Sequence, residues 1–247
     1  MRNLKSDYEL RLKNFEKLHK DGLTAKEISQ RLGVTIRTIE NYCNTLGLKP
    51  KREKSLNVDY FEEIKTEGQA YVLGFIYADG YIDSQEKAIS ITINKKDIDI
   101  LEKIRNELDS NAKFHDVKTP NCVRLNLCSK KLVSDIKQLG VCRAKSRIIR
   151  LPIIRDDLYR HFLRGYFDGD GHVGKRQVVV CTGSKLFRDD VAELLSKKFE
   201  MKISTKEQNN TYYIVLSRKD IDIVHWLYSD SRIYLNRKYD ITIVFPI

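Results

Sequence analysis

The chain has 247 residues and a formal net charge of +11, from 45 Lys and Arg against 34 Asp and Glu. With 41% hydrophobic residues it can form the core of one or two domains, while 12 glycines and 4 prolines exclude collagen-like and proline-rich chains. No apolar run approaches the roughly 20 residues of a membrane span, no secretory signal is visible, and the five cysteines contain no CxxC pair. We therefore expect a cytoplasmic protein with no membrane contact, whose basic excess points to a polyanion such as a nucleic acid.

The positive charge is densest at the N-terminus. Residues 1–56 carry 13 Lys and Arg against 7 Asp and Glu, a net +6. Residues 49–58 combine a proline with a charge cluster that includes Lys51 and Arg52, which is typical of a linker. Two interpretations stay open, a solvated loop and a basic linker that lies along a phosphate backbone. Either one separates a short N-terminal domain, residues 1–48, from a longer body.

Residues 24–47 predict two short helices joined by a tight glycine turn, the helix-turn-helix pattern. Thr24 and Glu27 fit a capping box at the start of the first helix, and Gly33 ends that helix where a left-handed residue is needed. The apolar spacing predicts the buried side of the second helix as Ile36, Ile39 and Tyr42. An upstream helix over about residues 7–19 completes a three-helix core.

The outward side of the second helix carries Arg and Asn, whose side chains can read base edges in a major groove. The DNA-binding candidates here are Thr35, Arg37, Thr38 and Asn41. The segment resembles the helix-turn-helix modules of resolvases and sigma factors, which implies contact with DNA. The alternative is a helical hairpin that packs against the body without touching DNA.

The body contains one nine-residue motif twice, at residues 72–80 (VLGFIYADG) and at residues 163–171 (LRGYFDGDG). Each copy reads as a helix and is followed by the same succession of segments, two strands, a helix, two strands and a helix. The sequence therefore predicts an α+β fold of two pseudo-symmetric αββαββα halves, over residues 59–155 and 156–247.

Small residues lie four positions apart on one face of each motif helix, which lets two backbones approach closely. They are Gly74 with Ala78 in the first copy and Gly165 with Gly169 in the second. We expect the two helices to pack together at a pseudo-twofold axis. The final glycine of each motif is expected at the C′ position of its helix, where a left-handed conformation is common.

Asp79 and Asp170 then come close together at two helix C-termini, where the helix dipole already disfavours negative charge. Divalent cations that bridge the pair would relieve both problems, and oxygen ligands with several waters suit Mg²⁺. Two metals around a phosphodiester can activate water and stabilise the leaving oxygen. An Asp-Gly pair is also a common turn dipeptide, but two copies in matched context favour a metal site.

These two segments resemble the motif of the LAGLIDADG homing endonucleases, in the single-chain form that carries two motifs. The flanking runs are also similar, among them Lys145-Ser146 between the copies and residues 235–239 near the end, so the resemblance covers about residues 57–245. It implies a saddle-shaped antiparallel sheet that straddles double-stranded DNA. It also implies Mg²⁺-dependent cleavage of both strands across the minor groove, which leaves short 3′ overhangs at a long asymmetric site.

The resemblance also implies roles for single residues. Asp79 and Asp170 match the metal-binding acids, and Ala78 and Gly169 match the residues whose backbone carbonyls complete the metal shells. Asn94 matches a polar position that orients a metal-bound water. The family has a lysine near the scissile phosphate, for which the candidates are Lys130 or Lys131 in one half and Lys219 or Arg218 in the other.

The sequence departs from the motif at two places. Tyr77 stands where the second copy keeps an acid, Asp168, and Arg164 stands where a small apolar residue is usual. Thr182 or Gly183 takes the place of Asn94 in the second half, so the halves are expected to be chemically unequal. Basic strand residues that would line the DNA face are Arg124, Lys175 and Arg176.

Together these features predict a monomeric, site-specific DNA endonuclease with an added helix-turn-helix, in a bacterial or phage-infected cell or an organelle. The alternative is an inactive LAGLIDADG scaffold that acts as a DNA-binding regulator, or as a maturase that binds intron RNA. Inteins carry the same endonuclease unit. Because the chain has no nucleophilic first residue and no terminal His-Asn, protein splicing is not expected.

Overall fold

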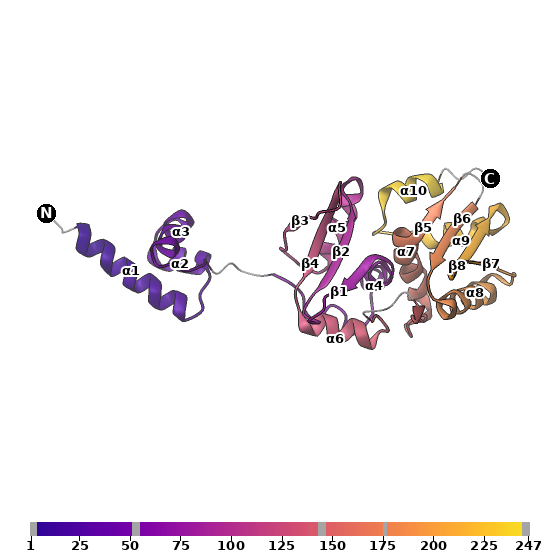
Figure 1. The fold of residues 1–247 in the computed structure, drawn as a ribbon, viewed down its shortest axis with the longest axis horizontal. Helices are drawn as coiled ribbons and strands as arrows, with labels where there is room; N and C mark the ends of the chain where they lie inside the picture. The colour runs from indigo at the N-terminus through magenta and orange to yellow at the C-terminus, as the bar shows by residue number, and fades with distance from the viewer. Residues whose placement is uncertain (1–3, 51–54, 143–146, 175–176, 244–247) are drawn as a thin grey trace. The chain divides into compact units, whose positions relative to one another are not determined.

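The structure is a computed structural model that describes residues 4–50, 55–142, 147–174 and 177–243. The chain divides into two compact units, Met1–Ser55 and Leu56–Ile247, each with its own hydrophobic core (Figure 1). Among the described helices, none combines the length and the apolar character that crossing a membrane would require.

The first unit consists of α1 (Leu4–Lys20), α2 (Ala25–Leu32) and α3 (Ile36–Thr45). The capping box at Thr24 is confirmed, because its hydroxyl accepts from Glu27 N at 3.3 Å and its N–H donates to the Glu27 carboxylate at 2.8 Å. Gly33 ends α2 with a φ of 64°, and Thr35 caps α3 by accepting from Thr38 N at 3.2 Å. Local capping and the glycine turn therefore fix the angle between α2 and α3.

The core of the first unit differs from the predicted one at Ile36. Its side chain is 50% exposed, whereas Ile39, Tyr42 and Cys43 are buried against α1 and α2. Ile36 stands in the first turn of α3, and Val34 from the preceding turn packs against the core instead. The prediction that Ile36 is buried was wrong because helical spacing does not show where the neighbouring helices end.

The second unit repeats one order of elements twice. The first half runs through α4 (Glu67–Asp79), β1 (Gly80–Ile82), β2 (Ile89–Asn94), α5 (Ile98–Glu107), β3 (Phe114–Asp116), β4 (Cys122–Leu127) and α6 (Lys130–Gln138). The second half runs through α7 (Tyr159–Asp170), β5 (Gly171–Val173), β6 (Gln177–Thr182), α8 (Lys185–Phe199), β7 (Ser204–Gln208), β8 (Thr211–Ser217) and α9 (Ile221–Tyr228). Then α10 (Asn236–Ile243) follows, and short 3-10 turns precede α5, α7 and α9.

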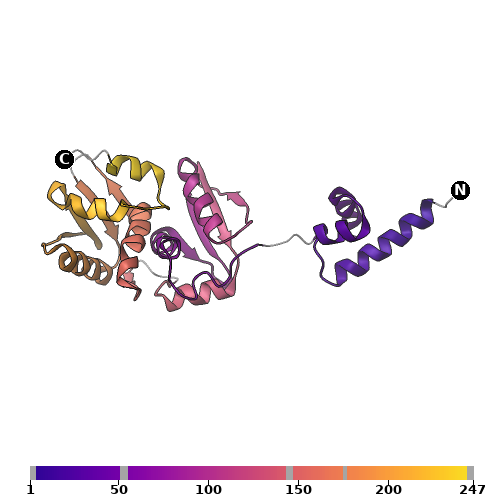
Figure 2. The ribbon, with the colours of Figure 1, turned by 180° about the vertical axis from the view of Figure 1, so that it is seen from behind.

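The strands form two antiparallel four-stranded sheets, in the orders β1-β2-β4-β3 and β5-β6-β8-β7. Their registers match between the halves, since Gly80 pairs with Ile91 as Gly171 pairs with Val180. The α+β class and the αββαββα halves are confirmed, with the strands divided into one sheet per half. Figures 1 and 2 show α4 and α7 side by side between the two sheets.

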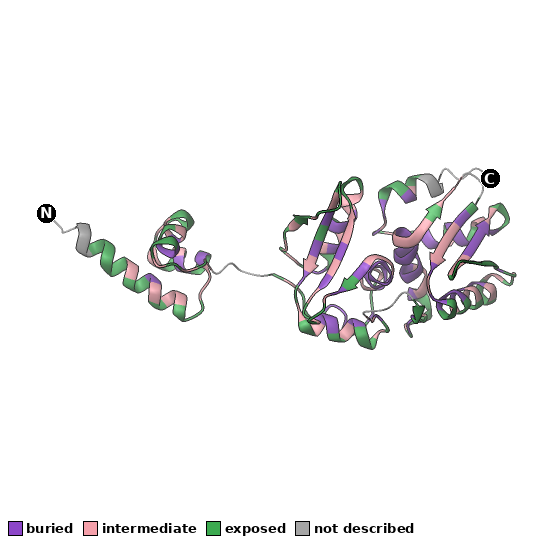
Figure 3. Cartoon of the chain, in the orientation of Figure 1, coloured by how far each residue is buried: buried purple, intermediate pink, exposed green. Residues whose placement is uncertain are grey.

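The two motif helices are buried along most of their length, as the purple segments of Figure 3 show. A Cβ on Gly74 would collide with the carbonyl oxygen of Phe162, and one on Gly165 with that of Tyr71. The small residues therefore do allow the backbones to touch, as predicted. The motif-closing glycines, however, are extended rather than left-handed, with φ of −73° at Gly80 and −83° at Gly171, because a strand begins at each.

Candidate functional site

The two motif acids lie at the same end of the helix pair. Asp79 is the last residue of α4 and Asp170 the last residue of α7. The helices are parallel, because Gly165 meets Tyr71 near their starts and Gly169 meets Ala78 near their ends. A Cβ on Gly169 would lie 3.1 Å from Asp79 Oδ2, so the carboxylate of the first half reaches the residue beside Asp170.

A cavity of about 270 Å³ opens beside Asp79 and takes its polar lining from both halves. The first half contributes Asp79, Asn94 and Asp97, and the second contributes Asp168, Gly169 and Arg237. Because a water molecule occupies roughly 30 Å³ of liquid volume, the cavity has room for several waters or a phosphate group beside the acid.

The end of α7 is fixed to β6 on the Asp170 side. The carbonyl oxygen of Asp170 accepts a hydrogen bond from the thiol of Cys181, with Sγ at 3.3 Å. The hydroxyl of Tyr166 donates to the carbonyl of Cys181 at 3.2 Å. Burial, with the negative charge of Asp170 nearby, raises the pKa of Tyr166, which keeps this hydroxyl protonated as a donor.

Lys238, in the first turn of α10, is a cation that sequence reasoning missed. Its side chain points into the end of α7, where Nζ donates to the carbonyls of Phe167 at 2.6 Å and Asp168 at 2.7 Å, with that of Gly169 at 3.4 Å. The residue is 3% exposed. Burial lowers the pKa of Lys238 to about 8, and the charges of Asp168, Asp79 and Asp170 oppose that shift.

Lys238 therefore supplies positive charge where the helix C-terminus and both motif acids are negative. The only sequence signal for it was the run of residues 235–239, which had been matched to the family without a role. The ammonium group also approaches the Gly169 carbonyl, which the sequence had assigned to a metal shell.

The donors at this place suit a hard divalent cation. Within residues 4–50, 55–142, 147–174 and 177–243, no three His, Cys, Asp or Glu side chains come together as a metal cluster. Instead, the carboxylates of the two motif helices and nearby backbone carbonyls would supply only part of the oxygen ligands of a metal ion. Such a set fits a cation like Mg²⁺, which keeps several waters when bound.

The polar positions beside the acids differ between the halves, as the sequence indicated. Asn94 ends β2, lines the cavity and accepts from Lys96 N through Oδ1 at 3.1 Å. Its counterpart Thr182 is buried, and its hydroxyl accepts from Ser184 N at 3.2 Å. An exposed amide thus faces the site in the first half, and a buried hydroxyl takes its place in the second.

The structure does not bring Lys130 and Lys219 to the acids. Lys130 follows the end of β4 at which Leu127 pairs with Ile89, and it lines a separate cavity with Glu86 and Lys137. Lys219 follows the end of β8 at which Ser217 pairs with Gln177, the end of β6 away from Thr182. Their neighbour Lys131 forms ion pairs with Asp59, Glu62 and Asp135, which raises its pKa.

The outer face of the first sheet is a polar surface built from aligned rows. Tyr81, Ser90 and Asn126 lie in register across three strands, and so do Thr92, Arg124 and His115. Side chains bond along the rows, with Ser90 Oγ to Asn126 at 2.8 Å and Arg124 Nε to Thr92 at 3.0 Å. Arg124 is exposed on the same face as Asn94, so the polar surface continues to the acidic site.

The outer face of the second sheet is less polar. Val179 and Val215 lie in register with His172 and Ser204, and Cys181 and Tyr213 with Lys206. The predicted DNA contacts Lys175 and Arg176 lie outside the described residues, as do Lys51 and Arg52 of the linker. The outer faces of the two sheets therefore differ in chemistry.

In the first unit, α3 presents the predicted outward side chains. Arg37 and Asn41 are exposed, Thr35 is the N-cap, and Thr38 is half-buried with its hydroxyl 2.9 Å from that of Thr35. Ile36 joins this surface as an apolar group. A thymine methyl is the apolar feature of the major groove.

Residues 157–225 match the family model described as a LAGLIDADG-like domain. The replication factor C small subunit of Methanocaldococcus jannaschii is 30% identical over 171 residues, which are 64% of this chain and 9% of that protein. The probable translation initiation factor IF-2 of the same organism is 27% identical over 159 residues, 58% of this chain and 13% of that protein. The chain spans less than a fifth of the length of the curated relatives it matches.

Two solved structures share the fold. The homing endonuclease I-WcaI bound to its DNA recognition sequence has a TM-score of 0.54 at 18% identity, and the match covers 83% of this chain and 98% of that one. I-DmoI in complex with DNA and Ca has a TM-score of 0.51 at 17% identity, over 74% and 97%. At these identities the similarity establishes the fold alone.

Proposed function

We propose that this chain, which matches a LAGLIDADG-like family model over residues 157–225 and shares its fold with two homing endonucleases, is a site-specific endonuclease that cuts both strands of duplex DNA. The observation that carries the proposal is the meeting of Asp79, Asp170 and Lys238 at one end of two touching helices. Packing alone does not explain two acids and a buried cation at the edge of a polar sheet, because apolar side chains would pack better there.

The carboxylates of Asp79 and Asp170 would hold divalent cations, with Mg²⁺ as the expected metal, beside the carbonyls of Ala78 and Gly169. When bound, such a cation activates water and stabilises negative charge on a phosphodiester. Asn94 orients water in the cavity through its side-chain amide. Lys238 balances the charge of the acids and stabilises the negative charge that develops as the phosphodiester is attacked.

The polar rows of the first sheet select the DNA site. Arg124 is a candidate for a guanine or phosphate contact, and Asn126 and Ser90 can bond base edges. A single chain carries both motif helices, so a monomer is sufficient for both cuts. The different face of the second sheet, with His172 and Lys206, favours a recognition sequence without twofold symmetry.

The first unit extends the contact with DNA. Its net charge of +6 attracts the phosphate backbone, and α3 offers Arg37, Asn41 and Ile36 to a major groove. The matched structures carry DNA, and one also carries Ca, which supports a duplex partner and a divalent cofactor for this chain. A cytoplasmic location in a bacterial or phage-infected cell, or an organelle, agrees with this role.

A cleavage selection tests the proposal without knowledge of the target. A supercoiled plasmid library with random inserts is incubated with the protein and Mg²⁺, and linear products are sequenced at their ends. We expect one enriched, asymmetric sequence cut with short overhangs. Asp79→Asn and Asp170→Asn should each remove linear product while binding the enriched duplex as the unchanged protein does.

The outcomes separate the enzyme from its alternative. A chain that enriches a duplex in binding but never linearises it, in Mg²⁺ or Mn²⁺, would be the DNA-binding regulator. Tight binding of structured intron RNA in place of duplex DNA would instead indicate a maturase. Cleavage that persists in the Asp79→Asn, Asp170→Asn double variant would place the active site elsewhere.

A further inference from the structure

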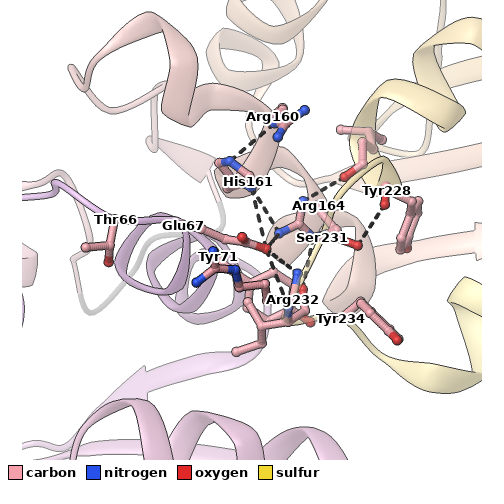
Figure 4. Close-up of polar contacts among 12 residues, drawn as sticks. Thr66, Glu67, Tyr71, Arg160, His161, Arg164, Tyr228, Ser231, Arg232 and Tyr234 are labelled. Atoms are coloured by element: carbon pink, nitrogen blue, oxygen red, sulfur yellow. Dashed lines mark hydrogen bonds and ion pairs between the residues drawn. The ribbon is translucent and has the colours of Figure 1, made fainter.

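The connection between α9 and α10, residues 229–235, is attached to the motif helices by buried polar groups. Polar groups without solvent are stable only when they are hydrogen-bonded, and charged ones need partners of opposite charge. Here the partners come from α4 and α7, and they bond mainly to the backbone of the connection. Figure 4 shows these contacts around Arg164 and Glu67.

Arg164 is the centre of the first group of contacts. Its side chain has no exposed surface, and it donates to the carbonyls of Leu227 at 2.7 Å through Nη1 and of Ile233 at 3.0 Å through Nε. Nη2 bonds the carboxylate of Glu67 at 2.6 Å. That carboxylate also accepts from Arg232 N at 2.7 Å, so the pair holds a carbonyl in the last turn of α9 and a carbonyl and an N–H of the connection.

Asp168 makes the second group of contacts one turn further along α7. It is fully buried, and its carboxylate accepts from the hydroxyl of Tyr71 at 2.6 Å, from the hydroxyl of Tyr228 and from Leu235 N at 2.7 Å. Burial raises the pKa of Asp168, and the two hydroxyls oppose the shift by stabilising the charged form. Because residues four apart share one helix face, Arg164 and Asp168 hold the connection from the same side.

The contact to Leu235 leads directly to Lys238. The carbonyl of Leu235 accepts from the backbone N–H groups of Lys238 and Tyr239, both at 3.0 Å, and thereby starts α10. Asp168 thus fixes the residue from which the turn that carries Lys238 begins. The ammonium of Lys238 donates to the carbonyls of Phe167 and of Asp168 itself, at the end of α7.

Among its described residues, 59–142 and 147–155, the first half has no such set of contacts, although it has the same fold. Leu73 and Tyr77 occupy the positions of Arg164 and Asp168. The Tyr77 hydroxyl donates to the carbonyl of Leu139, at the end of α6. Apolar packing and one hydroxyl are therefore enough to build this part of a half, and stability alone does not require a buried ion pair and a buried acid.

We propose that Arg164 and Asp168 are positioning residues that hold the α9–α10 connection so that Lys238 reaches the carbonyls at the end of α7, beside the motif acids. The proposal rests on the proposed function for its effect on cleavage. Arg164 acts on Lys238 through the backbone at Leu227 and Ile233, and Asp168 acts through Leu235. A lysine on an unattached connection would lose the fixed geometry that such a group needs in a reaction.

The test compares Arg164→Leu and Asp168→Asn with a control in the other half. Arg164→Leu installs the residue that the first half has at Leu73. Asp168→Asn keeps the side-chain volume but puts an amide group in place of one carboxylate oxygen. Either the Tyr228 hydroxyl or the Tyr71 hydroxyl together with Leu235 N then loses its acceptor. Tyr77→Phe is the control, since it removes a buried hydrogen bond of the same core without touching the connection. Tyr228→Phe, which deletes one donor to Asp168, serves if either variant fails to fold.

Two readouts are measured on the full chain, with folding checked by circular dichroism. The first is the rate at which an amine reagent modifies Lys238 without metal, located by peptide mapping and compared with Lys20 of the first unit, which pairs with Glu16, as internal reference. We expect about a tenfold increase in Arg164→Leu and Asp168→Asn, since the buried amine becomes free to open. The second is cleavage of the selected duplex, where kcat should fall by about 10- to 100-fold with little change in KM.

Both effects must occur in the folded variants, and neither in Tyr77→Phe. Unchanged modification of Lys238 overturns the attachment, and increased modification with unchanged kcat overturns its importance for cleavage. If the unchanged protein cuts no DNA, the proposed function fails. The modification rates still decide whether Arg164 and Asp168 hold Lys238.

Discussion

Lys238 contributes positive charge to the site although its side chain is buried. Desolvation lowers its pKa to about 8, yet the amine stays mostly protonated at neutral pH because the acids around it favour the charged form. Its three carbonyl partners at the end of α7 satisfy the donors of the ammonium group. The cation thus offsets part of the repulsion between Asp79 and Asp170 without occupying the cavity.

We predict that Lys238→Met lowers kcat by about 100-fold, in the range found when a single charge-stabilising group is removed from an active site. Methionine is unbranched and only one heavy atom shorter than lysine, and it removes the charge. Binding of the uncut duplex without divalent metal should change little, because Lys238 is buried. Initial rates under saturating DNA and gel-shift titrations measure the two effects.

Lys103→Met is the matched control for that variant. Lys103 also donates to the C-terminal segment, to the Tyr234 carbonyl and the Asn236 side chain, both at 2.7 Å. It lies over the Tyr234 ring, away from the carbonyls at the end of α7. An equal loss of kcat in both variants would mean that Lys238 stabilises the segment rather than the reaction.

At the scale of elements, the site depends on how closely α4 and α7 approach. The helices meet with backbone against backbone at Gly74 and Gly165, so the two acids arrive at one point. A methyl group at either glycine would push the helices apart over the whole pair. Asp79 would then withdraw from Gly169, and the separation of the two carboxylates would increase.

We predict that Gly74→Ala lowers the free energy of unfolding by about 2 to 3 kcal/mol, the usual range for an overpacked core. Gly68→Ala, on the same helix, should change it by less than about 1 kcal/mol, because the three atoms nearest to the new methyl all belong to the carboxylate at the flexible end of Glu107, and alanine favours the helix. Urea titration followed by circular dichroism gives both values. Equal stabilities of the two variants would contradict the role assigned to the contact at Gly74.

The sequence predicted the elements better than it predicted the contacts between them. The repeated motif located α4, α7 and the acids, because each copy of the pattern supports the interpretation of the other. The capping residues located α2 and α3, because the partners of a helix cap lie within four residues along the chain. Lys238 contacts residues about 70 positions away, and Arg164 was visible only as a departure from the motif. Periodicity cannot show such contacts, since they depend on how the halves pack.

At the scale of the whole molecule, the two units divide the positive charge almost evenly. Residues 1–56 hold +6 of the total of +11, and they have a core that shares no residue with the core of the second unit. The second unit contains both motif helices and Lys238. We therefore expect the proposed cleavage chemistry in the second unit, and we expect the first unit to contribute to affinity and to the length of the recognised site.

Removing residues 1–55 should weaken binding to a long duplex and leave the maximal cleavage rate nearly unchanged. Each phosphate contact contributes about 0.9 to the slope of log K against log salt, so a truncated chain that loses several contacts should show a slope smaller by several units. A short duplex that contains only the cut site is the control, and both proteins should bind it equally. Filter-binding titrations from low to physiological salt give the slopes. If the slopes and affinities are the same on the long duplex, the helix-turn-helix does not touch DNA, and its exposed Arg37 and Asn41 have another role.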